Sequence, residues 1–272
     1  MPISQAILLC TCSLERQSSF RPLKNTNIEK MKNLIDKTKK YLKSFYILLV
    51  LNKHKLSFLI PAFNSLFGYV GNNEKKIAET IEAMRTEMAA REGNIVYFAS
   101  PKPGSYSPEN QDKPVHGRVK EFSYRKAAFN GVNKQWGLFL HNLVKNKPSN
   151  NIIEMGTCSG FSGCYIASAN NFSKFVTIEV SSELCEIARG HIKKFSERFV
   201  AINKLFDDAI DDFLDEGLSG IDIAYIDGHH EKLATLHYFE RIKPMLNPDS
   251  VVILMTYIGL KICMMHGLFL DR

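Results

Sequence analysis

Carboxylate side chains follow each of four apolar runs in the second half of this 272-residue chain. Glu154 and Glu179 end two of these runs, Asp207 and Asp208 follow a third, and Asp227 follows a fourth. A carboxylate can accept hydrogen bonds from hydroxyl groups, bind hard cations and take up a proton. A single acid in this position usually caps a helix or lies in a solvated turn. Acids after four successive runs instead predict a polar rim around one binding crevice.

A glycine-rich loop follows the first of these acids. An apolar run leads into Glu154, Gly156 and Gly160, and a helix-like segment follows from Gly163 to Ala169. A strand that turns tightly into a helix in this way can let a ligand approach the backbone. The spacing E-x-G-x-x-x-G differs from the G-x-G-x-x-G of dinucleotide-binding loops. The loop alone is equally compatible with a purely structural turn.

The elements that must position these residues alternate between strand-like and helix-like patterns. Strands are predicted at residues 175–180, 199–206, 221–226 and 250–254, with helices between them and a turn at 246–249. This alternation predicts an α/β fold with a parallel sheet covered by helices on both faces. In such sheets ligands bind beyond the carboxyl ends of the strands, where the acids lie.

From about Trp136 to Leu254 the chain resembles the class I S-adenosylmethionine-dependent methyltransferases, in particular the small-molecule O-methyltransferase-like branch. The likeness rests on the glycine loop, on Glu179 at the end of the second strand, and on Asp227-Gly-His-His230, which is similar to the D-G-x-H motif of that branch. It implies a Rossmann-like sheet with helices on both faces, S-adenosylmethionine as the cofactor, and methyl transfer to an oxygen of a small molecule.

The resemblance also implies roles for single residues. The cofactor would be contacted by Glu154, Gly156, Thr157, Gly160, Ser162, Glu179 and Asp208. Glu179 would accept hydrogen bonds from both ribose hydroxyls, and Asp208 would lie near the adenine. Asp227 and His230 would act on the acceptor, with His230 as the base, and Asp227 could bind a divalent cation such as Mg²⁺. In the alternative interpretation, His229 and His230 only begin a helix that Asp227 caps.

The end of the chain departs from this pattern. In the metal-using members an acidic pair follows the fifth strand, whereas Met255 and Thr256 stand here. We expect a C-terminally truncated sheet, because the chain reaches Arg272 too early for a last helix and a closing antiparallel strand pair. Residues 255–267 can be back-translated and read one base out of frame to give D-D-I-Y-W-S-E-D-M-H-D-A-W, which is similar to the family. We therefore hypothesise that residues 255–272 are a frameshifted tail.

Two other function classes remain open. An inactive, truncated protein that binds the cofactor or a membrane would fit the atypical tail. A nicotinamide-dependent oxidoreductase would also place an acid such as Glu179 on a ribose, but the missing G-x-G-x-x-G disfavours it.

The N-terminal part of the chain is basic. Residues 1–60 hold 11 Lys+Arg and 3 Asp+Glu, and the remainder is almost neutral, so no nucleic-acid partner is expected. Apolar residues at helical spacing between Ile28 and Leu51 predict a basic amphipathic helix. Residues 28–55 would either contact an anionic membrane surface or, as we favour, dock on this chain or on a second subunit of a homodimer.

Domain boundaries follow from composition. A second accessory helix is predicted from Asn73 to Arg91, and a Pro-rich loop at residues 100–114 is the expected boundary. We expect a helical accessory region at 1–115, a cofactor-binding domain at 116–254 and the tail at 255–272. Six cysteines without a C-x-x-C pair and no signal-peptide pattern predict a cytoplasmic protein, which in the membrane-contact alternative is peripheral to the inner membrane face.

Overall fold

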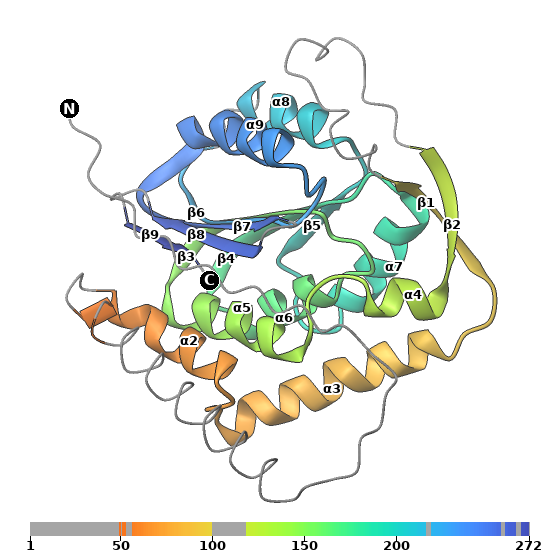
Figure 1. Cartoon of the computed structure of the whole chain (residues 1–272), viewed down its shortest axis with the longest axis horizontal. Helices are drawn as coiled ribbons and strands as arrows, with labels where there is room; N and C mark the ends of the chain where they lie inside the picture. Colours follow the sequence, from red (N-terminus) through yellow and green to blue (C-terminus); the bar gives the residue numbers. More distant parts are fainter. Residues whose placement is uncertain are drawn as a thin grey trace, which may run out of the picture.

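The computed structural model describes Leu49 and residues 51–52, 56–99, 118–215, 219–256, 259–264 and 268–271. Its centre is a seven-stranded sheet of order β5-β4-β3-β6-β7-β8-β9 (Figure 1). The strands are β3 (Ser149–Met155), β4 (Phe172–Ile178), β5 (Phe199–Ile202), β6 (Ile221–Ile226), β7 (Leu246–Thr256), β8 (Gly259–Met264) and β9 (Leu268–Asp271). Strands β3 to β7 are parallel, which confirms the predicted parallel sheet, and β8 and β9 are antiparallel to their neighbours.

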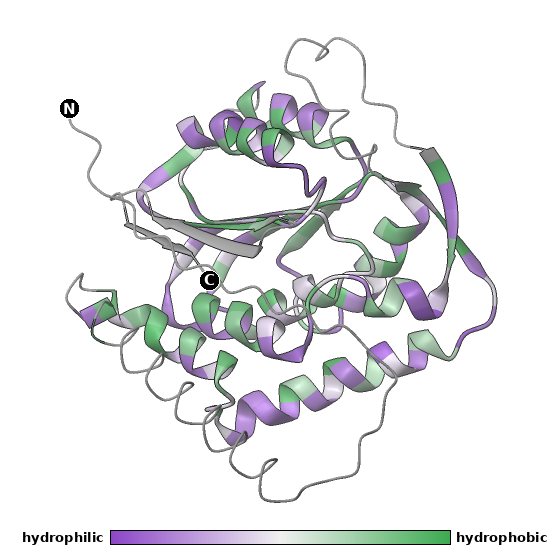
Figure 2. Cartoon of the chain, viewed as in Figure 1, coloured by the Kyte–Doolittle hydropathy of each residue, from purple (hydrophilic) through white to green (hydrophobic). Residues whose placement is uncertain are grey.

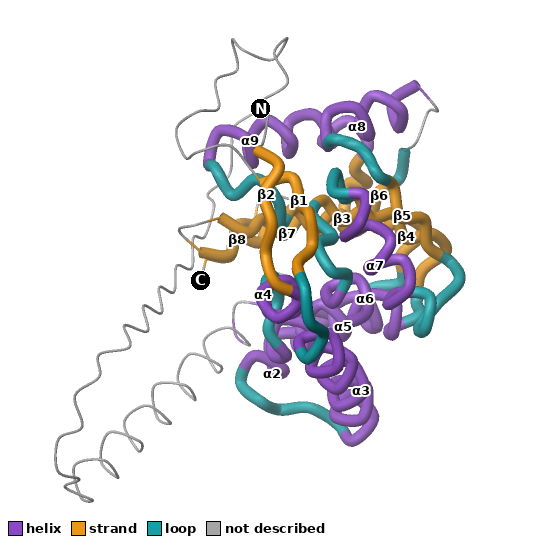
Figure 3. The backbone as a smooth tube through the Cα atoms, turned by 90° about the vertical axis from the view of Figure 1, so that its right-hand side faces the viewer, coloured by secondary structure: helices purple, strands orange, loops and turns teal. Residues whose placement is uncertain are grey.

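Helices cover both faces of the sheet. The helices are α2 (Ile60–Leu66), α3 (Asn72–Ala89), α4 (Tyr124–Phe129), α5 (Lys134–Asn146), α6 (Phe161–Ala169), α7 (Ser182–Ile192), α8 (Phe206–Asp215) and α9 (Lys232–Ile242), with 3₁₀ turns η1 (Ser57–Leu59) and η3 (Lys243–Met245). Helices α5, α6 and α7 pack on one face, and α8 and α9 pack on the other (Figures 1 and 3). Helices α2 and α3 form a further layer against α5 and α6.

Local sequence explains most of these elements. Every residue of β6 is buried, so this central strand is an apolar run rather than an alternating one. Apolar residues likewise concentrate in the strands of the sheet (Figure 2). Helices α4 and α5 begin where a side chain accepts a hydrogen bond from the first turn: Ser123 from Lys126 N, and Asn133 from Trp136 N.

A two-stranded ribbon, which the sequence did not predict, lies beside the amino end of α7. Strand β1 (Asn94–Ala99) pairs antiparallel with β2 (Arg118–Ser123). The backbone amide of Val96 donates to Glu183 Oε2 at 3.0 Å, and that of Phe98 donates to Ser181 Oγ at 2.7 Å. The ribbon is therefore fixed to the segment that follows β4 (Figure 3).

The expectation of a sheet without a closing antiparallel pair was wrong. Strand β8 pairs with β7 over six residues, from Thr256↔Gly259 to Val251↔Met264, and β9 pairs with β8. The physical reason is that β7 would otherwise present an unpaired edge, and the mostly apolar sequence after Gly259 can pair with it. The frameshift hypothesis concerns the gene rather than the fold and stays a prediction.

Two boundaries also differ from the prediction. The strand expected at 199–206 ends at Ile202, so Asp207 and Asp208 lie in the first turn of α8. The turn expected at 246–249 belongs to β7, where the pairing with β6 shifts register between Ile221 and Ile223. Short polar segments next to strands carry no periodicity, so sequence alone could not place these boundaries.

The accessory helix predicted at 73–91 is confirmed as α3. Most of the predicted amphipathic helix at 28–51, and the Pro-rich loop at 100–114, lie outside the described residues. Within the described residues, none of the helices combines the length and apolar character needed to span a bilayer.

Candidate functional site

Glu154, near the carboxyl end of β3, is fully buried. Its Oε2 accepts a hydrogen bond from Thr177 Oγ1 at 2.6 Å, and the Ser162 side chain also hydrogen-bonds to this carboxyl group. Among the described residues, Oε1 has no hydrogen-bond partner. Burial raises the pKa of Glu154 to about 7, and the charges of Asp227 and Glu179 add to the rise. This carboxyl group therefore titrates near neutral pH and would be stabilised in its ionised form by a cation.

The glycine loop between β3 and α6 packs closely against its surroundings. Gly156 and Gly160 have φ angles of +106° and +83°, in the left-handed region that favours glycine. A Cβ on Gly156 would lie 2.6 Å from the carbonyl oxygen of Asp227, and one on Gly160 would lie 2.7 Å from Ala188 Cα. Contacts within the protein are thus sufficient to explain both glycines, independently of any approach by a ligand.

Glu179 directly follows β4 and holds the glycine loop. Its Oε2 accepts a hydrogen bond from the Cys158 amide at 2.8 Å, and its Oε1 accepts one from the Ser181 amide at 2.9 Å. The side chain is largely buried, which raises its pKa. Because each carboxylate oxygen can accept a second hydrogen bond, both remain able to bind a diol. The Thr157 hydroxyl, one residue earlier in the loop, shares a short hydrogen bond with Thr177.

Asp227 follows β6 and lies next to the glycine loop, because β6 is the hydrogen-bonded neighbour of β3. Its amide donates to the Met155 carbonyl at 2.8 Å, and the buried Tyr225 hydroxyl donates to its Oδ2 at 2.6 Å. His230 Nδ1 lies 3.9 Å from Asp227 Oδ1 and 3.4 Å from the Met255 carbonyl oxygen. Burial raises the pKa of Asp227, while the hydrogen bond from Tyr225 and the nearby His230 oppose the rise.

Asp227, His230 and the glycine loop border an open pocket at the carboxyl end of the sheet, with about 380 Å³ of empty space including the part open to solvent; Glu154 and Gly160 lie outside its lining. One side consists of the glycine loop and the start of α6, and includes Thr157 and Ser162; Asp227 and His230 also line the pocket. The opposite side, which we call the pocket wall, consists of Asn130, Gly131 and Val132, between α4 and α5. The sequence did not identify the wall, although Asn-Gly is a turn signal.

Not all the predicted site residues line this pocket. Glu179 is connected to it through its hydrogen bond to Cys158, which lines the pocket, and Asp208 is an exposed residue of α8. The neighbouring Asp207 is used elsewhere, because it accepts hydrogen bonds from His237 at 2.8 Å and from Arg241 at 2.6 Å. His229 Nδ1 lies 2.9 Å from the Tyr238 hydroxyl of α9.

Residues 153–254 match a family model described as a methyltransferase domain. This segment is similar to methyltransferase domains. It runs from β3 to β7 and includes Glu154, Glu179, Asp227 and His230, but excludes α3, α4, α5 and the pocket wall. The chain matches none of the curated proteins.

Several solved structures are similar to the chain over less than half of its length. An O-methyltransferase from Bacillus cereus, in complex with SAH, is 28% identical to this chain. The match covers 46% of this chain and 57% of the Bacillus protein, with a TM-score of 0.42. The O-methyltransferase TomG from Streptomyces achromogenes, in complex with SAM, is 22% identical over 45% of this chain and 56% of its own, with a TM-score of 0.41. An SAH-bound methyltransferase from Podospora anserina is 18% identical. The match covers 46% of this chain and 54% of the Podospora protein, with a TM-score of 0.41. The chain thus spans little more than half of these proteins.

Proposed function

We propose that the protein is an S-adenosylmethionine-dependent methyltransferase that transfers a methyl group to an oxygen of a small molecule. The observation that carries the proposal is the pocket at the carboxyl end of a methyltransferase domain, bordered by Asp227 and His230 and adjoining the buried carboxyl groups of Glu154 and Glu179.

The residues of the pocket fit a cationic cofactor. Glu154 has an unpartnered buried oxygen among the described residues, and the charges of Asp227 and Glu179 further raise its pKa. Positive charge near these three groups would favour their ionised forms. The cofactor supplies a methyl group on a positively charged sulfur. Glu179 would hold it by accepting hydrogen bonds from the ribose hydroxyls, with the Cys158 and Ser181 amides fixing the carboxylate.

Asp227 and His230 are the groups that would act on the acceptor hydroxyl. His230 Nδ1 faces the Met255 carbonyl oxygen and a carboxylate oxygen of Asp227, an arrangement that favours the proton on Nδ1 and the lone pair on Nε2. Nε2 would then accept the proton of the acceptor hydroxyl, and the Asp227 carboxylate would stabilise the resulting imidazolium.

The residues present do not fit the divalent cation suggested for Asp227. The described part of the chain contains no group of three or more His, Cys, Asp or Glu side chains placed to hold a metal ion. The last two residues of β7, the fifth parallel strand along the chain, are Met255 and Thr256, where the metal-using members of the family were expected to have acids. We therefore derive no step that uses a metal.

A transfer assay tests the proposal. The full chain would be incubated with methyl-labelled S-adenosylmethionine and a panel of small hydroxyl compounds, and labelled product would be separated. We expect product with at least one acceptor, and a drop of about 100-fold in rate for His230→Gln. His237→Gln, on α9, is the matched control and should retain the rate. Absence of product across the panel, from a folded chain that binds the cofactor, would contradict the proposed reaction.

The finer predictions on partners stay proposals of the same kind. Contact of residues 28–55 with an anionic membrane and docking in a homodimer are supported by the basic amphipathic pattern of that segment, and a cytoplasmic location is supported by the spacing of the six cysteines. Liposome co-sedimentation of the full chain, with and without residues 28–55, would test the first of them.

A further inference from the structure

Arg85 of α3 is a buried cation outside the methyltransferase domain. Its side chain is 3% exposed, and its Nε donates to Glu82 Oε2 at 3.0 Å. The guanidinium also lies 4.4 Å from the ring centroid of Phe161, a residue that lines the pocket. Burying an arginine costs free energy unless its donors are satisfied, so the partners of the remaining nitrogens define what the residue does.

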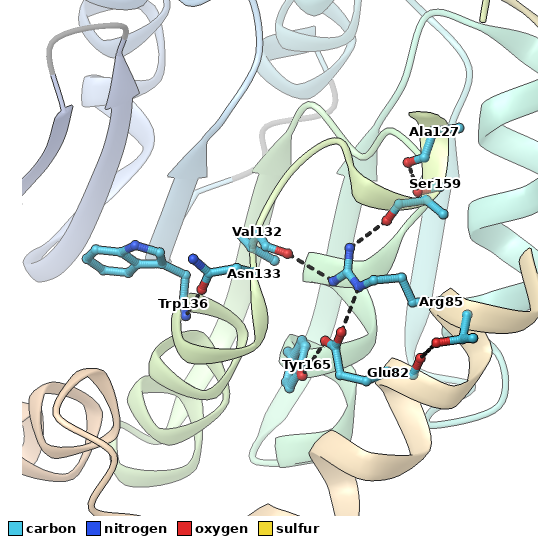
Figure 4. A network of polar contacts seen from close by, with 10 residues as sticks. Glu82, Arg85, Ala127, Val132, Asn133, Trp136, Ser159 and Tyr165 are labelled. Carbon is cyan, nitrogen blue, oxygen red and sulfur yellow. Dashed lines mark hydrogen bonds and ion pairs between the residues drawn. The ribbon is translucent and has the colours of Figure 1, made fainter. Parts of the chain in front are cut away.

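Those partners flank the pocket wall: Ala128 lies in α4, two residues before Asn130, and Val132 is the last residue of the wall. Arg85 Nη1 donates to the Ala128 carbonyl at 2.6 Å, and Nη2 donates to the Val132 carbonyl at 2.9 Å (Figure 4). The planar guanidinium therefore spans the wall with two charge-assisted hydrogen bonds in fixed geometry. The wall itself contains the exposed Gly131 at a φ of +100°, and a Cβ there would meet nothing within 4 Å, so no neighbouring atoms support that residue from the side where a Cβ would lie.

The same wall also contacts the glycine loop. Ser159 Oγ donates to the Ala127 carbonyl at 3.0 Å, and Asn130 Nδ2 lies 3.7 Å from Cys158 Sγ. Arg85 thus holds the wall from α3, and the glycine loop of the matched segment contacts the wall and the end of α4 from the other direction in the sequence, after β3.

We propose that Arg85 is a positioning residue for the pocket: by joining the Ala128 and Val132 carbonyls, it keeps Asn130, Gly131 and Val132 in the conformation that binds ligand. Ligand affinity in the domain then depends on a residue of the N-terminal region. The choice of S-adenosylhomocysteine as the ligand rests on the proposed function. The role of Arg85 in holding the conformation of residues 130–132 does not depend on it.

The test combines local hydrogen exchange with calorimetry on the full chain. In Arg85→Met, backbone amide exchange in residues 130–133 should be about tenfold faster without ligand, foremost at Asn130, whose amide donates to the Ala127 carbonyl at 3.3 Å, while the amides of β3 and β6 keep their rates. If the wall is then competent about one-tenth of the time, the Kd for S-adenosylhomocysteine rises about tenfold. Arg85→Lys, which can reach one carbonyl at a time, should give a smaller rise. Arg91→Met, an exposed arginine just after α3, is the matched control and should change neither quantity.

The outcomes separate the two proposals. Unchanged exchange at residues 130–133, or an unchanged Kd, in a folded Arg85→Met variant would overturn the role of Arg85. If Arg85→Met does not fold, the same two readings on Arg85→Lys decide. A wild-type chain that does not bind S-adenosylhomocysteine would refute the proposed function, and the exchange measurement alone would then decide on Arg85.

Discussion

The two sides of the pocket are built in different ways. On the side of the methyltransferase domain, carboxyl groups are fixed by the sheet: Glu154 pairs with Tyr225 and Thr177 in register, and Asp227 donates its amide to Met155. On the opposite side the wall offers mainly backbone and is held by Arg85 from α3. The comparison teaches that the charged groups of the site belong to the matched domain, whereas the shape of the pocket also depends on residues outside it.

A pair of glycines compares the two sides directly and should give the largest effect. Gly160→Ala would place a Cβ 2.7 Å from Ala188 Cα at a φ of +83°, whereas Gly131→Ala would meet open space at a φ of +100°. Both variants carry the left-handed penalty of about 1 kcal/mol, and Gly160→Ala adds a backbone clash. We expect losses in the free energy of unfolding of about 3 kcal/mol or more for Gly160→Ala and about 1 kcal/mol for Gly131→Ala, measured by urea titration. Equal losses would contradict the contrast.

Glu154 gives the domain side a pH dependence that the neutral wall cannot have. Its folded-state pKa of about 7 exceeds the ordinary value of 4.5, so the folded state binds the proton more tightly and loses stability as pH rises from 4.5 to 7. Glu154→Gln should remove this loss. The free energy of unfolding of the variant minus that of wild type should therefore be about 3 kcal/mol larger at pH 8 than at pH 4. Urea titrations at both pH values measure the difference. Parallel pH dependences of the two proteins would refute the assignment.

Tyr225→Phe tests how the domain sets the ionisation of Asp227. The hydrogen bond from Tyr225 lowers the pKa of this carboxyl group, against the effect of burial. Its removal should therefore raise the Asp227 pKa and move the acidic limb of the transfer rate to higher pH, with a loss of about 1–3 kcal/mol in stability for the unpaired acceptor. A pH–rate profile measures the shift. An unchanged acidic limb would show that Asp227 does not need to be ionised.

The smallest effect should come from the contact between the β1–β2 ribbon and the domain. Ser181→Ala removes the acceptor of the Phe98 amide and the hydrogen bond of the Ser181 side chain to Glu179, but leaves the Ser181 amide on Glu179 intact. We expect a loss of about 1 kcal/mol in stability and faster hydrogen exchange at Phe98, with little change in cofactor affinity. A large loss of affinity would show that the ribbon, like the wall, shapes the site.

Local patterns in the sequence were sufficient for the domain side of the site. Glu154, the glycine loop, Glu179 and Asp227 each follow a buried apolar run, and the parallel topology places all of them at one end of the sheet. The wall could not be predicted in the same way. Arg85 contacts Ala128 and Val132 across 43 and 47 residues, and nothing in the sequence around Arg85 distinguishes it from a solvated helical arginine.

Errors arose where short segments lack periodicity or where the family resemblance was extended too far. Asp207 and Asp208 are adjacent, so only the structure shows that Asp207 is bound by His237 and Arg241. The missing strand pair was inferred from the expected family tail, whereas backbone pairing along β7 depends on edge hydrogen bonds that many apolar sequences can satisfy.

Calorimetric titration of the full chain with S-adenosylhomocysteine tests the central claim most directly. We expect saturable binding to one site, weakened about tenfold or more in Glu179→Ala, because hydrogen bonds between a charged group and the ribose are lost. Glu186→Ala, at an exposed position on α7, should bind as wild type does. Absence of binding by a folded wild-type chain, or equal affinity in the Glu179→Ala variant, would contradict the account.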